Sequence, residues 1–200
     1  MIWVTVLAAG ESRRMGTQKL LLPFGETTVI EAIVRTALDS EAEGTVVVLG
    51  ANRERVRGVL KSYPLVFAVN KDYRLGMLSS IQAGFRALPT DAEAAVIMLG
   101  DQPTIPARVL DALIRAYRES RRGIVVPVHG GHRGHPVLID MKNKDEVLGL
   151  DPGIGLRQLL RTHPEDVLEV AVSSPEVLKD IDRPEDYREE VDQSSKAHRK

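Results

Sequence analysis

The sequence predicts an α/β protein with a mostly parallel sheet, and three observations support that prediction. Short apolar runs that suit buried strands alternate with segments whose apolar residues recur at helical spacing, which is the pattern of βαβ units. The chain has 200 residues, 43% of them hydrophobic, which is enough for one substantial core and cramped for two. Polar segments follow the apolar runs, and the carboxyl ends of such strands are the place where open α/β folds bind ligands. We therefore expect a single domain over residues 1–188.

The first half of the chain alternates four predicted strands with three predicted helices. The strands are short apolar runs at residues 2–7, 45–49, 65–69 and 94–99, and an apolar bend covers residues 20–25. The run at 94–99 is almost uninterrupted, as expected for a strand buried on both faces of a sheet. The helices show apolar residues every three or four positions, in the sets Val29, Ile30, Ile33, Val34, Ala37 and Leu38, then Val56, Val59 and Leu60, then Leu78, Ile81, Phe85 and Leu88.

The second half continues the alternation less regularly. Strands are predicted at residues 123–128 and 167–172, and a further apolar run ends at Ile139. The glycine-rich segment 149–155 follows no clear strand, so we interpret it as a turn before a helix at 156–161. Charged and polar residues with a single valine predict a disordered tail over 189–200. One more helix presents a shared apolar face, formed by Val109, Leu110, Leu113, Ile114 and Tyr117.

The composition of the chain argues against several classes of function. The formal net charge of -1, from 27 basic and 28 acidic residues, gives no general attraction for nucleic acid or membrane. Aromatic residues make up only 4% of the chain, which leaves few platforms for stacking single-stranded bases. Without cysteine there is no disulfide, thiolate nucleophile or cysteine zinc site. The amino terminus has no basic region, and no apolar run approaches the ~20 residues of a membrane span, so we expect a cytoplasmic protein.

The segment after the first strand has the composition of a phosphate-binding loop. It begins with small residues whose backbone a nucleotide can approach closely, and Gly16 permits a tight bend whose N–H groups can bind an anion. Arg14 can offer two parallel hydrogen bonds to phosphate, and Lys19 can add a mobile positive charge. In sequence, the segment contains Leu7, Ala8, Ala9, Gly10, Glu11, Ser12, Arg13, Arg14, Met15, Gly16, Thr17, Gln18 and Lys19.

Two better-known phosphate loops do not match this segment. A Walker A loop requires two glycines one residue closer together than Gly10 and Gly16, and Thr17 stands where its lysine belongs. A dinucleotide fingerprint requires G-x-G-x-x-G, which the segment lacks. Taken alone, the loop is equally compatible with solvated charges around an ordinary turn.

A family resemblance favours the phosphate-binding interpretation. The segment resembles the LAAGxSxRMGxxK signature of the MobA-like nucleotidyltransferases, and further likeness covers Gly76–Ser80 (a GMxxS turn), residues 131–137 (GxxGHPV) and residues 180–187 (D-I-D-x-P-x-D). The likeness runs from residue 2 to about 187. The signature is matched by Leu7, Ala8, Ala9, Gly10, Ser12, Arg14, Met15, Gly16 and Lys19.

The resemblance implies a three-layer, Rossmann-like nucleotidyltransferase fold of the nucleotide-diphospho-sugar transferase type. It also implies transfer of CMP from CTP, or another NTP, to the terminal phosphate of a molybdopterin-type cofactor, with Mg²⁺ and release of pyrophosphate. Ala9 stands where the guanylyl branch carries glycine, so the resemblance favours cytidine. A molybdoenzyme or its chaperone is an implied partner. The implied binding residues are Leu7, Ala8, Ala9, Gly10, Ser12, Gly16, Gly76, Ser80, Gly100 and His135.

Acidic residues supply the predicted metal site. Asp101 follows the strand at 94–99 directly, which places it at the carboxyl edge of the sheet. Mg²⁺ binds a few carboxylates together with substrate phosphates, so we expect Asp101 plus one later acid. Asp182 is preferred over Asp180, although Asp182 also matches an N-cap for the last helix. Arg14 and Lys19 are expected to stabilise the pentacoordinate phosphorus.

Several alternatives stay open. The acceptor could be a sugar or polyol phosphate, or GTP could be the donor to molybdopterin. The chain could instead hold molybdenum cofactor for insertion without catalysis, or be an NAD oxidoreductase, although the dinucleotide fingerprint is absent. A zinc site at His129, His132 and His135 is disfavoured because no acidic or thiol ligand stands nearby. The transferase hypothesis requires one cleft to contain the basic residues of the loop and Asp101.

Overall fold

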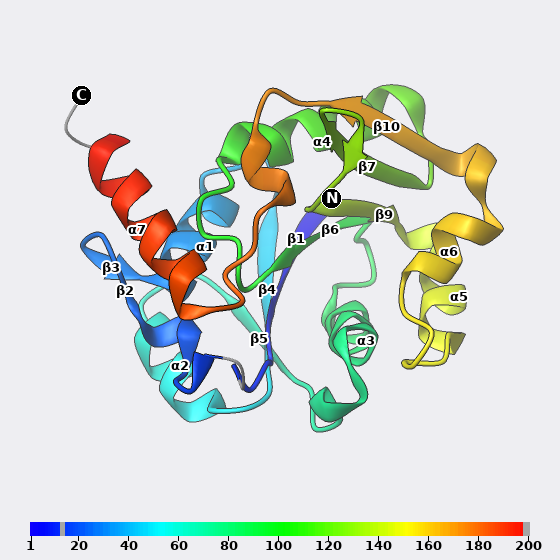
Figure 1. Ribbon diagram of the computed structural model, residues 1–200. Coiled ribbons are helices and arrows are strands. Elements are labelled where there is room, and N and C mark those ends of the chain that lie inside the picture. Colours follow the sequence, from blue (N-terminus) through cyan, green and yellow to red (C-terminus); the bar gives the residue numbers. More distant parts are fainter. Residues whose placement is uncertain (13–14, 198–200) are drawn as a thin grey trace.

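The computed structural model describes residues 1–12 and 15–197, arranged around a twisted eight-stranded sheet (Figure 1). The strand order is β10-β7-β9-β6-β1-β4-β5, and β8 (His132–Arg133) pairs with β7 outside that path. Neighbouring strands are parallel except that β9 runs antiparallel to β6 and β7, and β8 runs antiparallel to β7. This confirms the predicted mostly parallel sheet. The strands are β1 (Ile2–Ala8), β4 (Gly44–Leu49), β5 (Val66–Val69), β6 (Ala94–Leu99), β7 (Ile124–His129), β9 (Val137–Asp140) and β10 (Val167–Ala171).

Helices cover both faces of the sheet and make it the middle of three layers (Figure 1). One face packs against α1 (Val29–Leu38), α2 (Arg53–Leu60), α4 (Ala107–Ser120) and α7 (Pro184–Ala197). The opposite face packs against α3 (Met77–Ala87), α5 (Lys144–Gly149) and α6 (Arg157–Thr162). The structure therefore confirms the three-layer α/β architecture.

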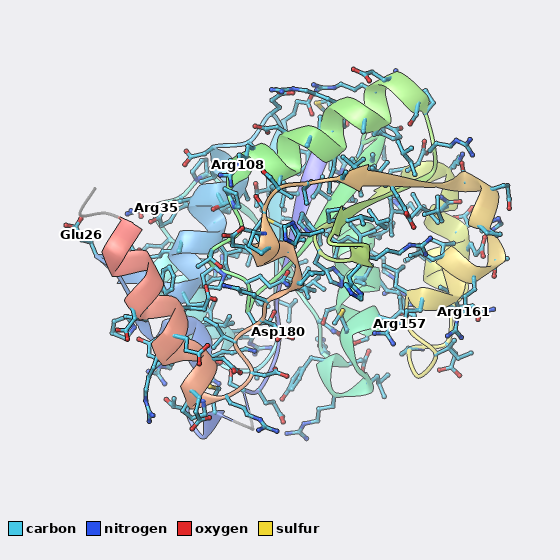
Figure 2. The ribbon with its side chains drawn as sticks, turned by 45° about the horizontal axis from the view of Figure 1, so that its top comes forward. Glu26, Arg35, Arg108, Arg157, Arg161 and Asp180 are labelled. Atoms are coloured by element: carbon cyan, nitrogen blue, oxygen red, sulfur yellow. The ribbon has the colours of Figure 1, made fainter. Side chains whose placement is uncertain are left out.

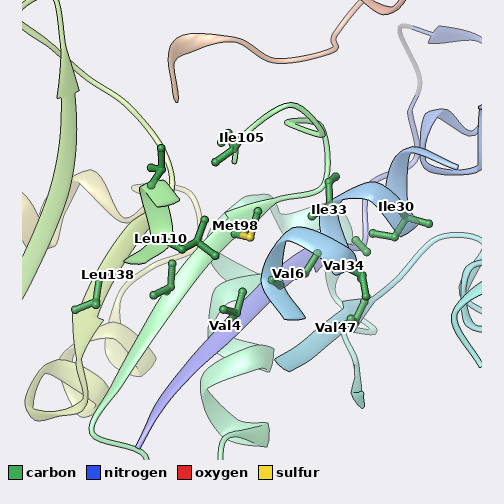
Figure 3. Close-up of a cluster of buried hydrophobic side chains, with 14 of the residues drawn as sticks. Val4, Val6, Ile30, Ile33, Val34, Val47, Met98, Ile105, Leu110 and Leu138 are labelled. Atoms are coloured by element: carbon green, nitrogen blue, oxygen red, sulfur yellow. The ribbon is translucent and has the colours of Figure 1, made fainter. Parts of the chain in front are cut away.

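The two cores follow from the alternation of side chains along the strands. Val4 and Val6 of β1 point into the core that contains α1 and α4, where Ile33 and Leu110 are fully buried (Figure 3). Thr5 points to the other face, against α3. Burying one such aliphatic side chain contributes about 1.5–3 kcal/mol, so the central strands fix the sheet on both sides.

Local signals explain where α1 begins. Thr28 precedes the helix, and its hydroxyl accepts a hydrogen bond from the backbone N–H of Glu31 at 3.4 Å. The Glu31 carboxylate accepts in return from the N–H of Thr28 at 2.9 Å, which completes a capping box. The short hairpin of β2 (Pro23–Phe24) and β3 (Thr27–Thr28) occupies the end of the predicted apolar bend and leads into this cap.

The sequence predicts a disordered tail over residues 189–200, whereas helix α7 extends into this segment and, in the described part of the chain, ends at Ala197. Helix α7 continues to that residue, because Tyr187 and Val191 lie one turn apart and pack against the core. The Tyr187 hydroxyl donates a hydrogen bond to the carbonyl oxygen of Pro23 at 2.5 Å, and Glu190 is only 6% exposed. Two apolar contacts on an otherwise polar segment are sufficient to dock the helix.

Gly84 allows α3 to approach the sheet closely, and we expect its replacement to destabilise the fold. A Cβ atom at this position would overlap the methyl group of Thr5 and lie 3.2 Å from that of Val48. Gly84→Ala should therefore lower the free energy of unfolding by about 1–3 kcal/mol, measured by urea denaturation. Gly58→Ala is the control, because it lies on the exposed side of α2 with no atom within 4 Å and should stabilise by about 0.5–1 kcal/mol. Equal effects of the two substitutions would contradict this account.

Candidate active site

A cleft of about 400 Å³ opens at the carboxyl edge of the sheet, beside the ends of β1 and β6. Lys19 and Asp101 both line it, which meets the main requirement that the sequence set for the transferase hypothesis. Arg14, the other predicted catalytic residue, lies outside the described residues. The lining consists of Leu7, Gly10, Ser12, Met15, Lys19, Leu20, Gly100, Asp101 and Asp182.

Lys19 connects distant segments of the chain at the centre of this cleft. Its Nζ donates to Oδ2 of Asp101 at 2.9 Å and to the carbonyl oxygen of Ile181 at 2.7 Å, and it lies 3.8 Å from Oδ1 of Asp182. The side chains of Lys19 and Asp101 are 15% and 23% exposed, so water screens their charges less than at the surface. The site therefore presents a desolvated cation and carboxylate side by side.

Ser12 organises the loop that carries Lys19. Its φ of 54° is in the left-handed region, and Gly16 has a φ of 66° at the predicted bend. The Ser12 hydroxyl donates to Oε1 of Gln18 at 2.6 Å and accepts from the backbone N–H of Lys19 at 3.2 Å. Ser12 thus connects the two ends of the loop. Sequence analysis did not single out Gln18, although a side-chain amide directly before Lys19 could have been recognised as a hydrogen-bonding partner within the loop.

The small residues that follow β1 differ in whether they are buried in the fold or open to the cleft. Ala8 and Ala9 are buried, and the carbonyl oxygen of Ala9 accepts from the N–H of Ala51 at 3.1 Å, which ties the loop to the end of β4. Gly10 lines the cleft, and a Cβ atom there would meet no other atom within 4 Å. Gly100 lies against β1, where a Cβ atom would overlap the carbonyl oxygen of Leu7. Gly10 is therefore the small residue whose backbone a ligand can approach most freely.

Residues 174–182, which we call the strap, cross the carboxyl edge between β10 and α7. Val177 and Ile181 anchor the strap in the core, with exposed fractions of 1% and 0%. The N–H of Ile181 donates to the carbonyl oxygen of Asp101, and the N–H of His135 donates to that of Val177, both at 2.9 Å. Figure 2 shows Asp180 on this segment. The strap thus brings the late acidic residues to the cleft.

The carboxylates fit a divalent cation such as Mg²⁺. Oδ1 of Asp101 is buried and has no hydrogen-bond partner within the described ranges 1–12 and 15–197. Among those residues there is no group of three or more histidine, cysteine, aspartate or glutamate side chains suited to hold a metal. Mg²⁺ needs no such cage, because it binds one or two carboxylates together with substrate phosphates and water. The unpaired oxygen of Asp101 therefore suits a divalent cation whose coordination nucleotide phosphates would complete.

The two candidate partners of Asp101 differ in position. Asp182 lines the cleft beside Lys19. Asp180 is exposed as a whole, but partial desolvation of its carboxyl, together with the charges of Asp101 and Asp182, raises its pKa. The N–H groups of Asp182 and Arg183, which directly precede α7, donate to Oδ2 of Asp186 at 3.0 and 2.7 Å. This geometry favours Asp182 as the second acidic residue.

Three other predicted binding residues lie beside the cleft lining rather than in it. Gly76, with φ 108°, is exposed before α3, and the Ser80 hydroxyl accepts from the Asn70 amide at 3.0 Å. His135 is partly buried beneath the strap, and its Nδ1 has no hydrogen-bond partner in the described part of the chain. Among the described lining residues of the cleft, none of the three is included. Their predicted contacts with ligand therefore remain predictions.

Burial lowers the pKa of His135, although the charge of Asp101 opposes the shift, and this makes stability depend on pH. As pH falls below the ordinary histidine pKa of 6.5, the unfolded chain gains a proton on this ring that the folded chain does not. The free energy of unfolding should therefore decrease through that window. His135→Gln should lose less stability between pH 7.5 and 5.5 than the unsubstituted protein, measured by urea denaturation. If both proteins lose the same free energy of unfolding between these pH values, His135 is not the cause of the pH dependence.

Comparison with known proteins extends these observations. Residues 4–167 match the MobA-like NTP transferase domain. The chain is 27% identical to the molybdenum cofactor cytidylyltransferase of Escherichia coli (strain K12), with 91% of each chain covered. It is 31% identical to the nicotine blue oxidoreductase of Paenarthrobacter nicotinovorans, with 88% of this chain and 90% of that one covered.

Solved structures show the same architecture. Rv0371c from Mycobacterium tuberculosis H37Rv, crystallised in complex with manganese, superposes with a TM-score of 0.81 at 27% identity, covering 96% of this chain and 98% of that one. That complex is consistent with divalent metal use by this group of proteins. Among residues 1–12 and 15–197, no helix has the length and apolar character needed to cross a membrane. Because the family model spans most of the chain, the protein belongs to the MobA-like NTP transferase family and is a nucleotidyltransferase.

Proposed function

We propose that this nucleotidyltransferase transfers CMP from CTP to the terminal phosphate of a molybdopterin-type cofactor, in a reaction that depends on Mg²⁺ and releases pyrophosphate. The observation that carries the proposal is the shared cleft of Lys19 and Asp101 behind an LAAG loop. The likeness to a molybdenum cofactor cytidylyltransferase over 91% of both chains supports the choice of donor and acceptor. The product would pass to a molybdoenzyme or its chaperone.

The proposed reaction is an in-line displacement at the α-phosphorus of CTP. An oxygen of the acceptor phosphate attacks, a new P–O bond forms, and the bond to the bridging oxygen of the β-phosphate breaks with its electron pair leaving on pyrophosphate. No general base is required, because a phosphate monoester is already an anion near neutral pH. Catalysis then depends on positioning and on charge stabilisation.

The residues of the cleft divide these tasks. Lys19 neutralises charge that accumulates around the α-phosphorus, with Arg14 as its predicted companion. Gly10 and the bend at Gly16 present backbone N–H groups to the triphosphate. Asp101, with Asp182, would hold Mg²⁺, which when bound stabilises charge on the phosphate oxygens. Each role uses a group that already lies in or beside the cleft, apart from Arg14.

The test is a pyrophosphate-release assay. Purified protein is incubated with Mg²⁺, molybdopterin and each of the four NTPs in turn, and pyrophosphate is counted. We expect release with CTP to exceed release with GTP by at least about tenfold, which corresponds to about 1.4 kcal/mol of discrimination. Equal turnover with GTP would overturn the assignment of CTP as the donor. Activity with a sugar or polyol phosphate in place of molybdopterin would overturn the assignment of molybdopterin as the acceptor.

The same preparation distinguishes the other classes of function. A module that only holds nucleotide or molybdenum cofactor would bind ligand without releasing pyrophosphate, and its binding would survive Asp101→Ala. Because a relative at 31% identity is named an oxidoreductase, NADH and NADPH consumption is measured in parallel. Nicotinamide turnover without pyrophosphate release would overturn the proposal.

A further inference from the structure

The buried side chain of Gln102 connects the Asp101 loop to the strap. Gln102 follows Asp101 directly and is 5% exposed. Its Nε2 donates to the carbonyl oxygen of Lys179 at 2.7 Å. A carbonyl oxygen can only accept, so this contact fixes which end of the amide faces the strap. A side-chain amide therefore binds the backbone of a segment 77 residues later in the chain.

The strap has no sheet pairing at this point, so hydrogen bonds hold its backbone together with the buried side chains of Val177 and Ile181. Next to the Gln102 contact, the N–H of Ile181 donates to the carbonyl oxygen of Asp101 at 2.9 Å. The carbonyl oxygen of the same residue, Ile181, accepts from Lys19. Lys179 and Ile181 flank Asp180, and Ile181 directly precedes Asp182. The separation between Asp101 and the later acids is thus set by contacts to residues 179 and 181.

The cost of burying Gln102 supports a specific role. Its other polar atom, Oε1, is buried and has no hydrogen-bond partner in the parts of the chain that the structure describes. A buried acceptor without a partner costs stability, so an apolar side chain of similar size would serve better if packing were the only requirement. What the amide gains over such a side chain is the single hydrogen bond to Lys179.

We propose that Gln102 is a positioning residue that holds the strap so that the carboxylates of Asp101 and Asp182 face one divalent cation. The inference rests on the proposed function, because it assigns these two acids to the metal. Gln102 itself contacts neither the nucleotide nor the cation in this role. Its loss should weaken metal binding and loosen the strap without altering the nucleotide loop.

The chain provides a matched control on the other side of the sheet. Gln82 of α3 is 6% exposed, and its Nε2 donates to the carbonyl oxygens of Val147 and Leu150 at 3.0 and 2.9 Å. It thus holds the end of α5 as Gln102 holds the strap. Gln102→Met and Gln82→Met remove the same amide from equally buried positions, so comparing them separates positioning of the metal site from general destabilisation.

Three measurements test the proposal: Mn²⁺ binding, hydrogen exchange and the KM for CTP. Binding of Mn²⁺ to nucleotide-free protein is followed by the electron paramagnetic resonance of free Mn²⁺, and hydrogen exchange of the peptide covering residues 177–183 is followed by mass spectrometry. Gln102→Met should weaken Mn²⁺ binding about 10- to 100-fold and speed exchange in that peptide. At saturating metal its KM for CTP should stay within twofold of the unsubstituted value. Gln82→Met should leave all three quantities unchanged and speed exchange only around residues 147–150.

The outcomes separate the possible failures. Mn²⁺ affinity of Gln102→Met within twofold of the unsubstituted protein, or an equal loss in Gln82→Met, would overturn the positioning role. If Gln102→Met does not fold, Gln102→Asn keeps a buried amide but is too short to reach Lys179, and the same loss of Mn²⁺ binding is expected. If the unsubstituted protein releases no pyrophosphate with any NTP, the proposed function fails, while the binding and exchange measurements still report on Gln102.

Discussion

Asp101→Asn should lower kcat for pyrophosphate release about 10²- to 10³-fold, the range seen when a preorganised charge-stabilising group is removed. The substitution keeps the shape of the side chain and leaves an oxygen to accept from Lys19, so the fold should be retained. It removes the negative charge, together with the anionic character of the buried Oδ1 that has no partner among residues 1–12 and 15–197. Mn²⁺ affinity should fall with kcat.

Asp91→Asn is the control for that measurement. Asp91 is exposed in the turn before β6, in the same part of the chain as Asp101. The substitution therefore removes one negative charge, as Asp101→Asn does, without touching the cleft. Its kcat and Mn²⁺ affinity should match those of the unsubstituted protein. An Asp101→Asn protein with kcat within fivefold of the unsubstituted value would remove Asp101 from the reaction and leave Asp182 as the proposed metal ligand of the cleft.

Lys19→Met should move two measurements in opposite directions. The kcat should fall about 10²-fold or more, because a positive charge near the α-phosphorus is lost. The affinity of nucleotide-free protein for Mn²⁺ should rise about fivefold or more, because the ammonium group that lies 2.9 Å from Asp101 and 3.8 Å from Asp182 repels a second cation. Steady-state kinetics and Mn²⁺ titration check the two results.

Lys61→Met is the matching surface substitution. Lys61 follows α2 and is exposed, so its removal changes the net charge equally without changing the field in the cleft. Neither kcat nor Mn²⁺ affinity should change. If Lys19→Met weakened Mn²⁺ binding, the role of Lys19 as a competing cation would be wrong even if its catalytic role survived.

The fold could be predicted largely because its strands are apolar runs that differ sharply from the helices between them. The run from Ala94 to Leu99 is buried almost throughout, as its composition indicates. Helix α5 was missed because its six residues, Lys144–Gly149, are too short to show a periodic apolar face and bury only Val147. The antiparallel direction of β9 also escaped prediction, because periodicity carries no information on which way a strand runs.

The site was predicted in part: Asp180 and Asp182 of the strap were expected near the metal, but the contacts that hold the strap at the cleft were not predicted. Lys19 and Asp101 were identified because each follows a strand, and parallel strands bring their carboxyl ends together. The contacts of Lys19 with Ile181, and of Gln102 with Lys179, join segments 162 and 77 residues apart through backbone carbonyl groups. Every residue has such a carbonyl, so no side-chain pattern could reveal which ones are used.

The position of the strap determines when the protein becomes active during its synthesis. Lys19 is synthesised long before Ile181 and Asp182, which lie beyond the residues 4–167 that match the family domain. A nascent chain that ends before the strap contains every strand of the sheet but lacks the second carboxylate. In the proposed reaction, chemistry at the phosphorus therefore has to wait until the strap has been synthesised, and a stop codon between β10 and the strap would yield a sheet with all its strands but without the proposed second carboxylate.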